Sequence, residues 1–179
     1  MNPDVTPLSE MNDLENILKE IEIIRARTPG QSFHVPMNPP ATIDQIEQRL
    51  TRVLGFKIPE DLKRFLLIHN GLRKGTWFDR YRPLSLEEII AQWRDDRQRE
   101  QEARGERDEV VKLPNHIPIM GDPTLHHKIY MDANDGSIMN YVVDGIYFEK
   151  FRYDTYLEFL IVAKDYLVRN AYFEWPNMD

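Results

Sequence analysis

The chain of 179 residues is long enough for one domain with a proper hydrophobic core, whereas two full domains would be cramped. Its formal net charge of −7 disfavours a general nucleic-acid binder and suits a basic partner, and the lack of cysteine excludes disulfides and thiol chemistry. No apolar run approaches the roughly 18 residues that a membrane span needs, and the acidic N-terminus does not match a secretion signal. We therefore expect a cytoplasmic protein without a membrane association.

The first 30 residues predict a helical extension. Apolar residues recur at helical spacing between about Ser9, a suitable N-cap, and Arg27. This stripe consists of Met11, Leu14, Ile17, Leu18, Ile21 and Ile24. If the helix does not fold back on its own chain, a homodimer seam would form from Leu14, Ile17, Ile21 and Ile24. Pro29 and Gly30 end the helix, and residues 31–40 form an extended connector.

The stretch at residues 40–71 predicts two short helices around which the rest of the chain packs. Thr42 and Gln45 form a capping box at the start of the first helix. Three- and four-residue spacing places one apolar stripe on this helix, made of Ile43, Ile46, Leu50 and Val53. Gly55 suits the left-handed position after a helix, and Pro59 suits the first position of the next one. The second helix is expected to bury Leu62, Phe65 and Leu66.

The middle of the chain combines aromatic and charged residues. Residues 76–81 predict an edge strand. Ser85 and Glu88 form a second capping box, which opens a helix that continues through Trp93. The mixed charges at residues 94–109 predict a solvated extension of this helix, followed by a mobile loop.

The C-terminal half predicts an antiparallel β-meander. Strands are expected at residues 116–120, 128–132, 137–143 and 146–151, and the turn signals are Asn134-Asp135-Gly136 and Asp144-Gly145. A third capping box, Thr155 with Glu158, opens a C-terminal helix, and residues 172–179 form an extended tail. The predicted fold class is α+β, with an antiparallel sheet that packs one face against helices.

Two blocks of this pattern resemble the SUKH superfamily, which groups fungal cell-wall synthesis regulators with bacterial toxin-immunity proteins. The first block matches at Pro40, Ala41, Thr42, Ile46, Leu54, Gly55, Ile58, Pro59, Leu62, Leu66, Asn70 and Gly71. The second block matches at Tyr130, Asp132, Gly136, Thr155, Phe159 and Leu160. The resemblance implies a single SUKH-like α+β domain over residues 31–171, with residues 1–30 and 172–179 as additions. The departures from the family pattern are the N-terminal helix, the charged insert before Pro114 and the doubled His126-His127.

The resemblance implies a non-enzymatic protein that acts by binding another protein. The first hypothesis is an immunity protein that neutralises a cognate bacterial toxin by occluding it, without a cofactor. The toxin would be a basic domain such as a nuclease or a deaminase. The alternative is a regulatory scaffold that docks cellular enzymes, akin to the cell-wall synthesis regulators of the same superfamily.

Motifs for catalysis are lacking, since the chain contains no Gly-rich phosphate loop, nucleophile elbow or His-Glu-x-x-His pattern. A metal site would combine His126 or His127 with Asp122, but adjacent strand residues point to opposite faces, and a polar loop explains them better. The run from Asp132 to Gly136 has its glycine at the fifth position, whereas a calcium loop needs it at the sixth, so turn chemistry explains these residues. A hydrolase that uses Asp132 with one of the paired histidines is a third class. We expect no metal ligand, no cofactor and no catalytic residue.

An acidic rim around aromatic side chains is the predicted partner-binding surface. Complementary charge would speed encounter with a basic enzyme, while buried aromatic rings would hold the complex. The predicted partner-binding residues are Trp77, Phe78, Asp79, Asp95, Asp96, Glu100, Asp122 and Asp132. Two observations weigh against this surface: arginines interleave with the acids at residues 94–107, and Trp77 and Trp93 also fit a hydrophobic core.

Overall fold

An antiparallel sheet of four strands forms the centre of the described part of the chain. The computed structural model describes residues 8–27, 37–73, 77, 81–103, 115–125, 127–142 and 153–169. The strands are β1 (Arg82–Pro83), β2 (His116–Gly121), β3 (His127–Asp132) and β4 (Ile138–Val142). They lie in the order β1-β2-β3-β4, and each neighbouring pair is antiparallel. The predicted meander is therefore confirmed.

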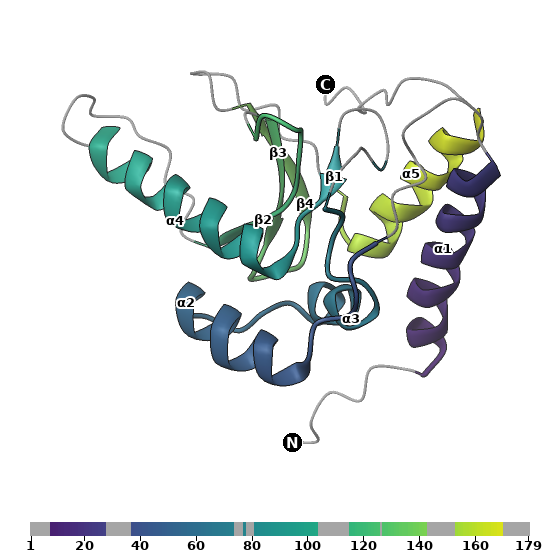
Figure 1. The fold of residues 1–179 in the computed structure, drawn as a ribbon, viewed down its shortest axis with the longest axis horizontal. Coiled ribbons are helices and arrows are strands. Elements are labelled where there is room, and N and C mark those ends of the chain that lie inside the picture. The colour runs from purple at the N-terminus through teal and green to yellow at the C-terminus, as the bar shows by residue number, and fades with distance from the viewer. Residues whose placement is uncertain are drawn as a thin grey trace.

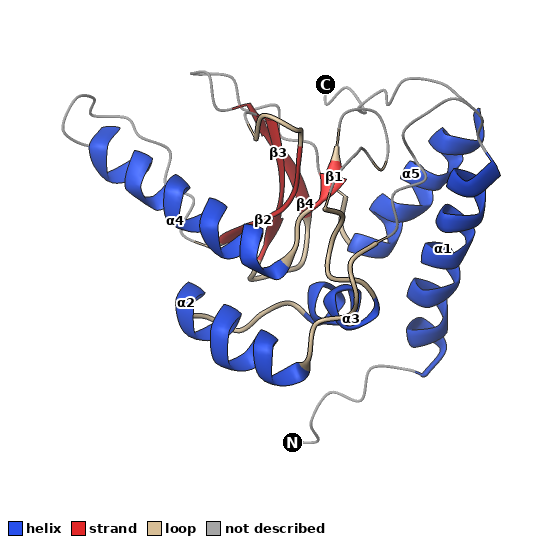
Figure 2. Cartoon of the chain, in the orientation of Figure 1, coloured by secondary structure: helices blue, strands red, loops and turns tan. Residues whose placement is uncertain are grey.

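Helices flank this sheet on opposite sides. They are α1 (Leu8–Arg27), η2 (Gln45–Thr51), α2 (Arg52–Leu54), α3 (Glu60–Ile68), α4 (Leu86–Ala103) and α5 (Tyr156–Arg169). In Figure 1, α4 runs along one side of the sheet, and α5 and then α1 lie on the other. Figure 2 shows the same arrangement, with the red strands between blue helices. The α+β class predicted from the sequence is confirmed.

The first helix of the central pair has the predicted cap but a different winding. The Thr42 amide donates a hydrogen bond to Gln45 Oε1 at 2.8 Å, and the Gln45 amide donates to Thr42 Oγ1 at 3.2 Å. Residues 45–51 nevertheless form a π-helix, η2, before one turn of α-helix in α2. A π-helix closes its hydrogen bonds from residue i to residue i+5, so each turn contains more residues than an α-helical turn.

This wider turn moves the buried stripe. The buried residues are Ile46, Leu50 and Leu54, which follow one another at intervals of four. Two members of the predicted stripe fall away from the core, since Ile43 is 52% exposed and Val53 is only half-buried. The prediction assumed the alternating three- and four-residue spacing of an α-helix, which the π-helix does not keep.

The connections around α3 follow the sequence signals closely. The helix begins at Glu60, so Pro59 is its N-cap and not its first residue as predicted, but Leu62, Phe65 and Leu66 are buried as predicted. Gly55 has a φ of 80° and thus takes the expected left-handed conformation. Gly71 has a φ of 70°, and a Cβ atom placed there would overlap the carbonyl carbon of Leu84 and the amide nitrogen of Ser85. The chain therefore needs glycine at position 71 both for its backbone angle and for the close approach of another segment.

Both faces of the sheet are covered, so the prediction that one face is covered was incomplete. Residues of β3 alternate between the two faces, and the buried stretch includes Lys128 and Tyr130 on one face and Ile129 and Met131 on the other. Ile129 and Met131 belong to the main hydrophobic cluster. Lys128 and Tyr130 face α4, because both donate hydrogen bonds to Asp96 of that helix. Helix α4 therefore covers this second face at Asp96. Other residues of its predicted solvated extension are exposed, namely Arg94, Gln98, Arg99, Gln101 and Glu102.

Helix α1 packs on α5 of the same chain. The apolar residues Leu14, Ile17, Leu18 and Ile21 are at most 6% exposed and belong to the main hydrophobic cluster. At the edge of this contact, Lys164 Nζ of α5 donates to Glu20 Oε2 of α1 at 2.8 Å. Three residues of the predicted homodimer seam, Leu14, Ile17 and Ile21, are thus buried within one chain. They are not exposed for contact with a second copy.

Two predicted strands differ from the structure or lie outside its described part. β1 begins at Arg82, and of the predicted edge strand at residues 76–81 only Trp77 and Tyr81 lie within the described residues. The Trp77 amide donates to the Tyr81 carbonyl at 2.6 Å, directly ahead of this short strand. Outside the described residues lie the predicted strand at 146–151, the turn at Asp144-Gly145 and the tail at 172–179.

Candidate interaction groove

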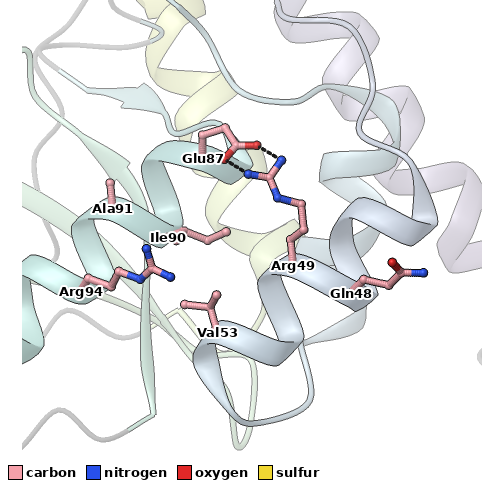
Figure 3. A pocket seen from close by; sticks show the side chains of 7 residues that line it. All are labelled: Gln48, Arg49, Val53, Glu87, Ile90, Ala91 and Arg94. Carbon is pink, nitrogen blue, oxygen red and sulfur yellow. Dashed lines mark hydrogen bonds and ion pairs between the residues drawn. The ribbon is translucent and has the colours of Figure 1, made fainter.

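A groove of about 380 Å³ lies between the segment η2–α2 and helix α4. One wall consists of Gln48, Arg49 and Val53, and the other of Glu87, Ile90, Ala91 and Arg94. In Figure 3, Val53 and Ile90 point toward each other from the two walls. Ile90 is 7% exposed and Val53 is half-buried, so the floor of the groove is apolar. We call this site the α2–α4 groove.

Charged side chains frame the apolar floor. Arg49 and Glu87 join the two walls through a bidentate pair, with nitrogen–oxygen distances of 2.5 and 2.6 Å (Figure 3). Both side chains are slightly more than half exposed, so the pair is worth only about 0–1 kcal/mol of stability. Arg94 lies toward the other end of the groove, where it is exposed and makes no ion pair within the described part of the chain.

Hydrogen bonds at the start of α4 fix the orientation of its wall. The predicted capping box is present: the Ser85 amide donates to Glu88 Oε2 at 2.9 Å, and the Glu88 amide donates to Ser85 Oγ at 3.3 Å. Arg82 of β1 donates to the same carboxylate at 3.0 and 2.6 Å, and Asn70 accepts from the Leu86 amide at 2.7 Å. Burial opposes the charge of Glu88, yet the bonds from Arg82 and Ser85 lower the pKa of its carboxyl. These bonds favour the ionised carboxylate, and they join the start of the groove wall to the segments of Arg82 and Asn70.

Two of the predicted partner-binding residues, Trp77 and Asp122, are buried. Trp77 is fully buried and lies edge-on to Phe65, with ring centroids 6.3 Å apart, so its side chain is part of the core. Asp122 is only 6% exposed, in the connection between β2 and β3. Phe78 and Asp79 lie outside the described residues.

Three other predicted acids lie beside basic side chains of the same chain. The pairs are Asp95 with Arg99 (3.1 Å), Glu100 with Arg97 (2.8 Å) and Asp132 with His116 (3.7 Å). The arginines that interleave with the acids in the sequence therefore also pair with them in space, as expected for neighbours on one helix. This pairing weakens the acidic rim as a docking surface.

Sequence reasoning did not identify the α2–α4 groove. Its two walls come from segments far apart in the chain, and Arg49 and Glu87 are 38 positions from each other. The only sequence signal was an apolar stripe on each helix, which placed Val53 and Ile90 together with fully buried neighbours. A partly exposed floor becomes visible only when the two helices are placed side by side.

Asp96 is the centre of a buried polar network between α4 and the sheet. Lys128 Nζ donates to Asp96 Oδ1 at 2.5 Å, and the Tyr130 hydroxyl donates to Asp96 Oδ2 at 3.0 Å. The side chains of Lys128 and Asp96 are 1% and 13% exposed. Burial raises the pKa of the Asp96 carboxyl, although the hydrogen bond and charge of Lys128 oppose the rise. The prediction that this part of α4 is solvated was therefore wrong at Asp96.

Both walls of the groove and the network around Asp96 lie within a stretch that carries a family's sequence pattern. Residues 39–161, more than half of the chain, match the sequence model of the SMI1 / KNR4 family (SUKH-1). The chain belongs to this family. The match confirms the resemblance to the SUKH superfamily that the central helices and the C-terminal half indicated. No curated protein gives a significant match.

SUKH-1 membership supports a role in protein interaction, of the immunity or regulator type, and the family is generally non-enzymatic. In the described ranges, no helix is long and apolar enough to cross a membrane. Within the same ranges, no group of three or more histidine and acidic side chains is placed to hold a metal ion. His126, one of the residues weighed as a metal ligand with Asp122, lies outside them.

Acidification is expected to destabilise this SUKH-1 protein through two half-buried histidines, His69 and His116. His116 of β2 contacts Met139 Sδ at 3.2 Å, and His69 follows the end of α3. Burial lowers the pKa of both imidazoles below 6.5, although Asp132 partly opposes the shift at His116. Between the folded and unfolded pKa values the unfolded chain binds more protons, so the stability present above about pH 6.5 is lost as the pH falls.

Urea unfolding between about pH 7.5 and pH 5 would measure this loss. The variant with both His69→Gln and His116→Gln should show a shallower fall over the same range. An unchanged slope in that variant would show that other groups cause the acid sensitivity.

Proposed function

We propose that this SUKH-1 protein is a non-enzymatic immunity protein, which acts in the cytoplasm and neutralises a cognate bacterial toxin by occluding it. The observation that carries the proposal is the α2–α4 groove, a partly apolar concavity within the residues that match the family. An apolar floor with a charged rim is the usual anatomy of a site that grips another protein. The formal net charge of −7 favours a basic toxin domain, such as a nuclease or a deaminase, because opposite charge speeds encounter.

A regulatory scaffold is the second candidate function. It is favoured by the internal pairing of Asp95 and Glu100 with arginines, which leaves α4 without a strongly acidic face. A scaffold would bind several cellular enzymes with modest affinity, whereas an immunity protein would bind one toxin tightly.

Co-expression with a toxin domain tests the first function directly. Any toxin domain that proves to be encoded beside the gene of this protein would be expressed in a bacterial host with and without the full chain. We expect the chain to restore growth and to form a stable complex with that toxin, but not to protect against a toxin domain from an unrelated gene pair. An active neighbouring toxin that is neither bound nor neutralised would refute the immunity function. Turnover of a small molecule that is lost in Asp132→Asn would refute the non-enzymatic assignment.

A further inference from the structure

We infer that the α2–α4 groove binds a segment of the protein partner in which an aliphatic side chain lies next to a carboxylate. The inference deepens the proposed function and rests on it, since it assigns the chemistry of the contact that the binding protein makes. The inference rests on an apolar floor that lies beside Arg94, an exposed arginine that makes no ion pair within the described part of the chain.

The apolar floor of the groove indicates the aliphatic side chain of the bound segment. Val53 and Ile90 face each other across it, and Ala91 beside them is exposed with only a methyl group. A volume of about 380 Å³ is at the low end for ligand sites and suits a few side chains of one short segment. Insertion of an aliphatic side chain would remove Val53 and Ala91 from water, which is the favourable term expected for such a contact.

The charged rim of the groove indicates the carboxylate of the bound segment. The chain as a whole is acidic, yet two of the three charged residues that line the groove are arginines. Glu87 already holds Arg49 through both oxygens, so neither charge is free for a partner without breaking that pair. Arg94 remains, and its planar guanidinium matches a carboxylate with two parallel hydrogen bonds. An acidic side chain of the partner is therefore the complementary group at this end.

A selection from a random 12-residue peptide library displayed on phage, with the full chain as bait, would test this assignment without knowledge of the toxin. Peptides that bind should be enriched in Asp or Glu within four positions of Leu, Ile, Val or Met. Arg94→Glu should weaken their binding about tenfold or more, because it replaces an attraction by a repulsion. Ala91→Trp should abolish it by filling the groove.

Two matched substitutions control for charge and bulk elsewhere on the same helices. Arg52→Glu changes an exposed arginine that neighbours Val53 but does not line the groove, and Gln101→Trp adds the same bulk to an exposed position near the end of α4. Both should leave peptide binding within about twofold of the parent chain. Thermal unfolding of all four variants would show that each is folded.

The outcomes separate this inference from the proposed function. Three results would overturn the assignment. The selected peptides could show no preference for Asp or Glu, they could bind Ala91→Trp as well as the parent chain, or the selection could yield no enriched peptides. A toxin that is neutralised equally well by the parent chain, Arg94→Glu and Ala91→Trp would leave the immunity function standing and remove the groove from it. A selected acidic peptide together with a toxin that does not bind would refute the immunity function but keep the groove as a docking site.

Discussion

Replacing Asp96 by alanine is expected to lower the free energy of unfolding by about 3–5 kcal/mol. The substitution leaves the Lys128 ammonium, which is 1% exposed, without its carboxylate partner at 2.5 Å. It also removes the acceptor of the Tyr130 hydroxyl on the same face of β3. A buried charge that loses its partner keeps its full desolvation cost. The expected loss of stability therefore far exceeds the contribution of an average hydrogen bond. Urea unfolding followed by tryptophan fluorescence would measure it.

Two controls isolate the buried charge as the cause. Asp95→Ala removes the neighbouring carboxylate, which is 43% exposed and pairs with Arg99, and should change the stability by less than about 1 kcal/mol. The double variant Asp96→Leu with Lys128→Met removes both buried charges and should recover most of the lost stability. If Asp96→Ala lowered the free energy of unfolding no more than Asp95→Ala, the network would not hold α4 on the sheet as its geometry indicates.

The second large effect is expected for Gly71→Ala, which should cost at least about 3 kcal/mol. Two penalties combine at this position. A residue with a side chain is strained at a φ of 70°, and the new methyl group would overlap the backbone of Leu84 and Ser85. Backbone atoms cannot move aside as a flexible side chain can, so the contact between α3 and the start of α4 would have to open. The midpoint of thermal unfolding should fall by many degrees.

Gly55→Ala is the matched control for the backbone angle. Gly55 has a similar φ of 80°, but a Cβ atom there would meet nothing within 4 Å. This variant should therefore lose only the roughly 1–2 kcal/mol of a left-handed residue. Equal losses for the two glycines would mean that the close approach of Leu84 contributes nothing, and the account of Gly71 would fail.

The starts of the helices were predictable because their signals are local. A capping box requires residues only three positions apart, and the boxes at the first central helix and at α4 formed as predicted. At α5 the pattern is slightly displaced. The Glu158 amide donates to Thr155 Oγ1 at 3.1 Å, but the Glu158 carboxylate accepts from the amide of Asp154. The helix begins where expected in spite of this shift.

Features that depend on distant contacts were not predictable from one sequence. Asp96 lies in a run of charged residues whose pattern predicts a solvated helix, and its partner Lys128 is 32 positions away. The π-helical winding of η2 likewise follows no local signal, since its residues have the spacing of an ordinary amphipathic helix. The α2–α4 groove includes both features, since one wall contains residues of the π-helix η2 and the other belongs to α4, which contacts the sheet through Asp96.

The packing of α1 has a practical consequence for recombinant work on this protein. The family pattern spans residues 39–161, so a chain trimmed to those limits would lack α1 and would also stop within α5, before the buried Ala163. The surface that the two helices now hide from each other would meet solvent, and such exposed apolar area promotes aggregation. The main hydrophobic cluster thus extends beyond the limits drawn from the family on both sides, from Leu14 of α1 to Ala163 of α5.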